Sequence, residues 1–169
     1  MAGEFFREIS SFNTAIAGGW VQTLGRYTRP MDEPDNNSYC KPLIGLRLRS
    51  VEANDPVWSF VFADDISILD VAPWRLLDGE RIVVTSEDHG HPFGLPAPVD
   101  AAERVLAVIS SKAVVAAYIT RITSDLIIDF GGHVHLQCLQ MSCGYESWRL
   151  VVRGSETICT GGGGIAHFP

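Results

Sequence analysis

Hydrophobic residues recur with helical spacing close to the start of the chain. Phe5, Ile9, Phe12 and Ile16 are separated by four, three and four positions, so their side chains fall on one face of a helix. A glycine pair follows directly at 18–19, where helices commonly end. The pattern therefore predicts an amphipathic helix that ends ahead of these glycines.

A second helix is predicted after Pro96 and Pro98. Asp100 and Glu103 have the spacing of an N-terminal capping box, with Asp in place of the more usual Ser or Thr. The apolar residues that follow recur at helical intervals and form the expected buried face: Ala102, Val105, Leu106 and Ile109.

The remaining apolar runs are short, rich in Val, Ile and Thr, and bounded by Gly, Asp or Ser, which is typical of β-strands. A run at Trp20–Tyr27 is followed by a polar loop over residues 28–41. The other predicted strands are Leu43–Val51, Val57–Phe62, Ile66–Val71, Arg81–Thr85, Val114–Ile122, Leu126–Phe130, Val134–Leu139, Ser147–Val152 and Thr157–Thr160.

A tetrapeptide of the first half recurs in the second half. Trp74–Leu77 is matched by Trp148–Val151, and a helix precedes the strands in each half. Further matches keep the same order: Gly79 with Gly154, Val83 with Ile158, Thr85 with Thr160, and Phe60–Phe62 with Ile128–Phe130. The predicted fold class is therefore α+β, with two diverged helix-plus-antiparallel-sheet repeats packed as one domain with pseudo-twofold symmetry. The first repeat is residues 1–97, and the second is residues 98–169 with a glycine-rich C-terminal tail.

Composition and charge narrow the function classes. Hydrophobic residues make up 46% of the chain and charged residues 20%, as in a globular protein. No apolar run approaches the roughly 20 residues that span a bilayer, and the N-terminus lacks the features of a signal peptide. A cytoplasmic protein without membrane contact is therefore expected. A net charge of -7 with scattered Lys and Arg disfavours nucleic-acid binding and favours a basic partner.

No catalytic motif is present. The chain lacks a G-x-S-x-G elbow, and its cysteines carry neither a catalytic signature nor metal-site spacing, which favours buried hydrophobic roles for most of them. The glycines at 161–164 lack the Lys, Ser or Thr and following helix of a phosphate-binding loop, so they predict a flexible end or a wide bulge. We expect no catalytic residue and no cofactor.

The histidines offer an alternative. His89 and His91, and likewise His133 and His135, have H-x-H spacing, which places both rings of a pair on one side of a strand. Two such pairs could converge on a metal ion, because neutral imidazole is a common ligand. The alternative hypothesis is a small metal-dependent enzyme, whereas the simpler interpretation is a set of exposed polar residues.

One stretch resembles a family. Ser142–Leu150 is similar to the S-x-G-Y-E-x-W-x-L stretch of small uncharacterised bacterial proteins, some of which resemble immunity proteins. The resemblance covers the second half of the chain and reaches the first only through Trp74–Leu76. It implies binding to a toxin delivered between cells, and it brings no catalytic residue.

The leading hypothesis is a cytoplasmic immunity protein that binds a cognate, basic toxin and blocks it. Acidic residues would steer and contact the toxin, with aromatic residues and histidines as anchors. This predicted contact set is Asp32, Glu33, Asp35, Asp64, Asp65, Tyr39, His133, His135 and Tyr145. A structural homodimer that pairs through an exposed sheet edge is a further alternative, and the sequence leaves monomer and homodimer open.

Overall fold

The alternating apolar pattern of the chain produces antiparallel sheets. The structure is a computed structural model that describes residues 36–54, 57–69, 71 and 73–169. Within these residues the chain forms eleven strands, one α-helix and three short 3-10 helices. The helix predicted ahead of residue 18 and the run at Trp20–Tyr27 lie outside the described residues.

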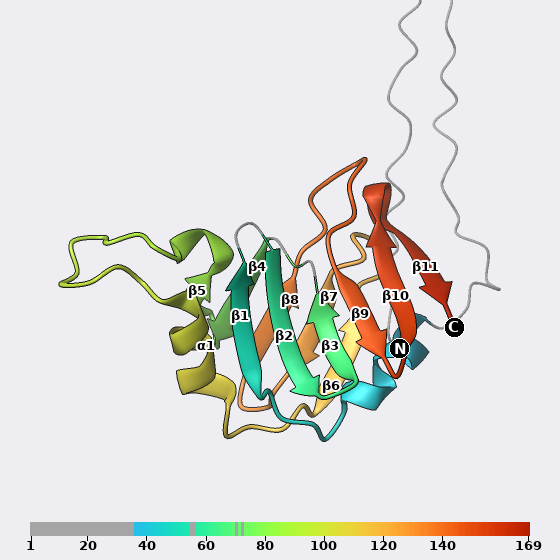
Figure 1. Ribbon diagram of the computed structural model, residues 1–169, viewed down its shortest axis with the longest axis horizontal. Coiled ribbons are helices and arrows are strands. Elements are labelled where there is room, and N and C mark those ends of the chain that lie inside the picture. The colour runs from blue at the N-terminus through green and yellow to red at the C-terminus, as the bar shows by residue number, and fades with distance from the viewer. Residues whose placement is uncertain (1–35, 55–56, 70, 72) are drawn as a thin grey trace, which may run out of the picture. The chain divides into compact units, whose positions relative to one another are not determined.

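One sheet has six strands, and it faces the viewer in Figure 1. Its order is β1 (Ser50–Asn54), β2 (Val57–Ala63), β3 (Ile66–Leu69), β9 (Arg149–Val152), β10 (Ser155–Thr160) and β11 (Gly164–Phe168). All neighbours are antiparallel. Along β2, buried Trp58, Phe60 and Phe62 alternate with half-buried residues, so one face of the sheet is covered.

The second sheet has five strands and lies behind the first in Figure 1. Its order is β5 (Arg81–Thr85), β4 (Trp74–Asp78), β8 (Val134–Cys138), β7 (Leu126–Asp129) and β6 (Ala116–Ile119), again antiparallel throughout. Buried Val134, Leu136 and Cys138 alternate with half-buried His135 and Gln137 on β8. His135 and Gln137 thus lie on the face of β8 opposite its buried residues.

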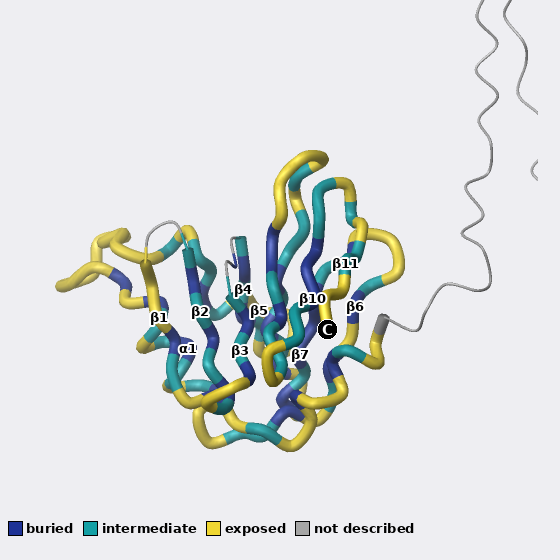
Figure 2. Tube along the Cα trace, turned by 45° about the vertical axis from the view of Figure 1, so that its right-hand side comes forward, coloured by how far each residue is buried: buried dark blue, intermediate teal, exposed yellow. Residues whose placement is uncertain are grey.

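The two sheets share one hydrophobic core. On β2, the Trp58 ring meets the Trp74 ring of β4 edge-on with 4.9 Å between centroids, and Phe60 meets the same ring at 5.3 Å. Figure 2 shows buried residues along the strands and exposed residues at the connections. Trp74 and Trp148 are each 1% exposed, so both tryptophans of the repeated tetrapeptide belong to the core.

Short helices flank the sheets. α1 (Ala101–Ile109) packs against β1 and β5, and the Asp100 carboxylate accepts a hydrogen bond from Glu103 N–H, as the capping pattern predicted. The 3-10 helix η1 (Asn36–Leu43) lies along β6, where the Asn37 side chain accepts from Ile119 N–H at 2.9 Å. The described part of the chain contains no helix long and apolar enough to cross a membrane.

The predicted fold class, two helix-plus-sheet repeats with pseudo-twofold packing, is wrong. The described chain is mostly strand, and neither half forms a sheet of its own. The chain crosses between the sheets after β3 and again after β8, so β3 pairs with β9 while β4 pairs with β8. Each sheet is therefore completed by strands from the other half. The repeated tetrapeptide lies on β4 and at the start of β9, the two strands that make these junctions.

Strand positions were predicted better than strand partners. β2, β3, β5, β7 and β8 coincide with predicted runs to within two residues. The run predicted at Leu43–Val51 is replaced by the end of η1, a turn and then β1, because Pro42 and Gly45 interrupt it. β11 was not predicted, since glycines precede it and only residues 165–169 follow them.

Candidate functional site

Two of the predicted acidic contact residues, Asp64 and Asp65, form ion pairs within the fold. Asp64 and Asp65 form the turn from β2 to β3. The Arg49 guanidinium contacts the Asp64 carboxylate, and Arg153 Nε lies 3.8 Å from Asp65 Oδ2. Neighbouring arginines thus offset both charges, which weakens them as a contact surface. The other predicted acidic residues, Asp32, Glu33 and Asp35, lie outside the described residues.

The four histidines serve separate local roles. His89 Nδ1 accepts from Ala101 N–H at 3.2 Å, and its ring meets Trp58 edge-on. His91 lies beside Phe93, with 5.5 Å between ring centroids.

The other pair is separated by backbone geometry. His133 is an exposed turn residue with φ +68°, and on β8 His135 Nδ1 lies 3.9 Å from an Asp129 carboxylate oxygen. Among the described residues, no group of three His, Cys, Asp or Glu is placed to hold a metal ion. The geometry therefore does not bring His89, His91, His133 and His135 together.

The two predicted tyrosine anchors lie in different settings. The Tyr39 ring of η1 stacks on His167 of β11, with 4.3 Å between centroids and 17° between planes. Tyr145 is 80% exposed on the connection from β8 to β9. Tyr39 thus holds η1 against the six-stranded sheet, whereas Tyr145 is available to a partner.

Tyr145 belongs to a surface made of three chain segments, which we call the loop-end surface. They are residues 120–125 between β6 and β7, residues 139–148 between β8 and β9, and residues 160–164 between β10 and β11. Figure 1 shows the β8–β9 connection (orange) and the β10–β11 turn (red) rising at the same end of the sheets. Loops at the end of packed sheets commonly carry binding function.

Gln140 ties these segments together. Its side chain donates from Nε2 to the Thr160 carbonyl at 2.6 Å, and its backbone N–H donates to Asp125 Oδ1 at 2.7 Å. The other oxygen of Asp125 accepts from the Thr123 hydroxyl at 2.6 Å. One glutamine therefore joins all three segments.

The 3-10 turn η3 (Gly161–Gly163) is held from two sides. The Ser124 hydroxyl donates to the Gly163 carbonyl at 2.6 Å, and Gly162 N–H donates to the Ser142 carbonyl at 2.9 Å. A Cβ on Gly161 would lie 2.5 Å from the Gly144 carbonyl carbon, so this close approach requires glycine. The prediction of a flexible end or a wide bulge is wrong, because this segment is a packed turn that leads into β11.

Two buried side chains, Trp148 and Cys159, contact the backbone of the loop-end surface from the core side. Trp148 Nε1 donates to the Ser124 carbonyl at 3.0 Å, and the Cys159 thiol approaches the same oxygen at 3.6 Å. Burial raises the pKa of Cys159, with a further rise from the Asp125 charge and a partial offset by Ser147 and Gln140. Cys159 thus lacks the lowered pKa that is typical of a reactive cysteine.

Apolar side chains protrude from this braced backbone. Ile122 is 94% exposed, Met141 74% and Tyr145 80%, and the Cys143 thiol is exposed beside them. In Figure 2 the highest loop, which is the β8–β9 connection, is exposed (yellow) at its tip. Exposed apolar groups on fixed loops are typical of a contact surface for another protein.

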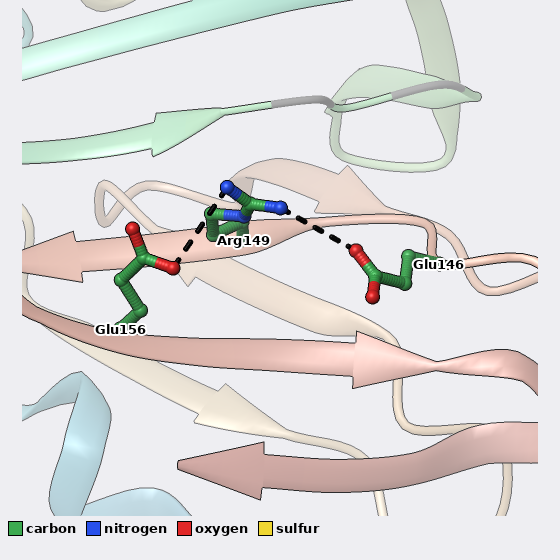
Figure 3. Close-up of polar contacts among 3 residues, drawn as sticks. All are labelled: Glu146, Arg149 and Glu156. Atoms are coloured by element: carbon green, nitrogen blue, oxygen red, sulfur yellow. Dashed lines mark hydrogen bonds and ion pairs between the residues drawn. The ribbon is translucent and has the colours of Figure 1, made fainter. Parts of the chain in front are cut away.

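The stretch Ser142–Leu150 forms part of this surface and of the strand that supports it. Figure 3 shows Arg149 between Glu146 (Nη2 to Oε2, 3.5 Å) and Glu156 (Nη1 to Oε2, 3.8 Å). Arg149 lies at the start of β9, Glu146 precedes it in the loop, and Glu156 is on β10. These ion pairs orient the end of the loop relative to the six-stranded sheet.

The sequence analysis named Tyr145 as a contact residue but did not name Ile122 and Met141, which are exposed on the same surface. A usable signal existed, since both are large apolar residues within polar turn segments, Thr120–Asp125 and Gln140–Gly144.

In comparisons with known proteins, no family model, curated protein or solved structure matched the chain.

Proposed function

We propose that this chain is a cytoplasmic, immunity-type binding protein that neutralises a cognate protein toxin by direct contact through the loop-end surface. The observation that carries the proposal is the exposure of Ile122, Met141 and Tyr145 on hydrogen-bonded loops. Leaving such side chains in water has no structural benefit for the isolated chain. Covering them with a partner contributes about 1.5–3 kcal/mol for each large apolar side chain.

Bracing of the loops supports the same function. A loop that must be ordered on binding loses conformational entropy, and that loss subtracts from affinity. Here the ties made by Gln140 and Ser124 order the loops in the free protein. The surface is therefore preorganised for contact.

Charge plays a different role from the one the sequence suggested. The charged residues of the three segments are Arg121, Asp125 and Glu146, so the surface itself is close to neutral. The net charge of -7 acts at longer range and speeds the approach of a basic toxin. Apolar contact supplies affinity after the encounter.

The test uses the product of the gene next to this one, which the proposal expects to be the toxin, with its active site inactivated. Titration calorimetry with the wild-type chain is expected to give saturable binding. Tyr145→Ala is expected to weaken the dissociation constant roughly tenfold, about 1.4 kcal/mol. Tyr118→Ala is the matched control, because Tyr118 is also exposed (41%) but lies on β6.

Two outcomes would contradict the proposal. One is the absence of measurable binding by the wild-type chain at micromolar concentration. The other is an equal effect of Tyr145→Ala and Tyr118→Ala, which would remove the loop-end surface from the contact. Far-UV circular dichroism of both variants checks that each is folded.

A further inference from the structure

A second exposed apolar region lies on the connection between β5 and α1. The 3-10 helix η2 (Ser86–Asp88) ends β5, and the chain then runs through residues 89–99 before α1 begins at Ala101. We call residues 89–99 the projecting loop, because in Figure 1 it extends to the left, beyond β5 and α1. It contains no Asp, Glu, Lys or Arg.

Backbone hydrogen bonds within the projecting loop fix its conformation. Gly90 N–H donates to the Val99 carbonyl and Val99 N–H donates to the His91 carbonyl, both at 2.9 Å. Nearer the tip, Leu95 N–H donates to the Pro92 carbonyl at 2.6 Å. The foot is anchored by Val99, which is 4% exposed, and by the contact of His89 with Trp58. The loop is therefore a fixed protrusion.

The tip of the projecting loop exposes apolar groups. Phe93 is 65% exposed and Leu95 45% exposed. Phe93 has φ +41°, in the left-handed region that a bulky side chain rarely adopts. Such backbone conformations persist where the surroundings impose them and cluster at binding sites.

Carboxylates flank the projecting loop on both sides of its base. Glu87 and Asp88 precede the loop, and Asp100 and Glu103 follow it, with Arg104 as the nearest basic residue along the chain. The Asp88 carboxylate is fixed by Thr85 N–H at 2.8 Å, and Asp100 is fixed as the cap of α1. The protrusion is thus apolar at its end and acidic at its base.

We propose that the projecting loop inserts Phe93 and Leu95 into an apolar cleft with a basic rim on the toxin, and that this insertion blocks the cleft. A narrow convex loop buries its apolar tip only against a concave surface. The acidic base then meets the rim of that cleft, which requires basic groups on the partner. This inference rests on the proposed function, and it assigns the blocking role to the projecting loop and additional affinity to the loop-end surface.

The experiment measures binding and inhibition separately, with the active product of the neighbouring toxin gene. The double variant Phe93→Ala/Leu95→Ala is expected to raise the inhibition constant at least roughly tenfold, and inhibition by the wild-type chain is expected to compete with the toxin's substrate. Phe168→Ala is the matched control, because Phe168 is 55% exposed on β11, and it should inhibit like the wild type.

The outcomes separate the two proposals. If the wild-type chain neither binds nor inhibits the toxin, the proposed function fails and the loop proposal fails with it. If the wild-type chain inhibits and the double variant inhibits equally well, only the loop proposal is overturned. Thermal unfolding confirms that the double variant is folded.

A charge variant tests the basic rim. Glu87→Gln is expected to slow association severalfold at low salt and to reduce the dependence of the association rate on salt. Glu80→Gln, in the exposed turn between β4 and β5, is the control and should have the smaller effect. Equal rates for the two variants would contradict a basic rim at the base of the loop.

Discussion

The loop-end surface and the projecting loop both expose large apolar side chains, yet they are held in place by different means. In the loop-end surface, bonds such as Ser124 to Gly163 join segments that lie far apart in the sequence. In the projecting loop, the bonds between Gly90, His91 and Val99 all lie within one connection. The first surface therefore depends on correct pairing of both sheets, whereas the second depends mainly on its own stem. Substitutions at comparable positions should affect the two regions unequally.

Substitution of glycine should give the largest contrast. Gly161→Ala places a methyl group 2.5 Å from the Gly144 backbone, which cannot yield, so we expect a loss of about 3 kcal/mol in unfolding free energy. Gly90→Ala meets no atom within 4 Å, and only its φ of +79° is unfavourable, so about 1 kcal/mol is expected. Urea unfolding measures both. Equal losses would show that Gly161 is not packed as described.

The two tryptophans of the repeated tetrapeptide, Trp74 and Trp148, should differ next. Trp148→Phe removes both packing and the Nε1 hydrogen bond to Ser124 below the loop-end surface, so about 2 kcal/mol is expected. Trp74 Nε1 has no hydrogen-bond partner in the described part of the chain, so Trp74→Phe should cost about 1 kcal/mol less. Thermal unfolding of the two variants checks the difference. A larger loss of stability for Trp74→Phe than for Trp148→Phe would contradict a stabilising role for the Trp148 hydrogen bond.

Thiol chemistry distinguishes the loop tip from its support. Cys143 is exposed, whereas Cys138 and Cys159 are buried, and burial raises the pKa of both buried thiols, with Asp125 adding to the effect. Iodoacetamide at pH 8 should therefore modify Cys143 and spare these two, which peptide mass mapping would show. Modification of Cys159 at the same rate as Cys143 would contradict the burial of Cys159 beneath the loop-end surface.

The same pKa direction predicts how stability depends on pH. Above the ordinary thiol pKa of about 8.5, the unfolded chain releases thiol protons that the folded chain retains. Unfolding free energy should then fall with rising pH, by about 1.4 kcal/mol per unit for each fully protected thiol. Cys138→Val should reduce this dependence. The pH dependence of urea unfolding of the wild type and of this variant tests the prediction.

The smallest effect is expected where function is proposed. Tyr145→Ala and Phe93→Ala remove exposed side chains, so each should change unfolding free energy by no more than about 0.5 kcal/mol. The two changes should also be additive, since Tyr145 and Phe93 lie on separate connections of the chain. A loss above about 1.5 kcal/mol for Tyr145→Ala would mean that this side chain supports the fold.

Local patterns in the sequence were sufficient for several elements. Short apolar runs bounded by turn residues located β2, β5 and β8, because such runs are typical of strands in a partly buried sheet. The Asp100 and Glu103 spacing located the start of α1, since the cap acts within one turn. The repeated Trp-Arg-Leu stretch identified two buried tryptophans. Each of these signals depends on neighbours within a few residues.

Strand partners and the surfaces were decided only in three dimensions. Every strand offers the same backbone donors and acceptors, so nothing in the Trp74 or Trp148 stretch states that β4 pairs with β8 and β9 with β3. The loop-end surface arises from that exchange, since Gln140, Asp125 and Thr160 meet only after both sheets have formed. The amino-acid sequence alone thus determined the positions of most strands and the start of α1. Long-range strand pairing decided which apolar loop residues, such as Ile122 and Met141, remain exposed to water.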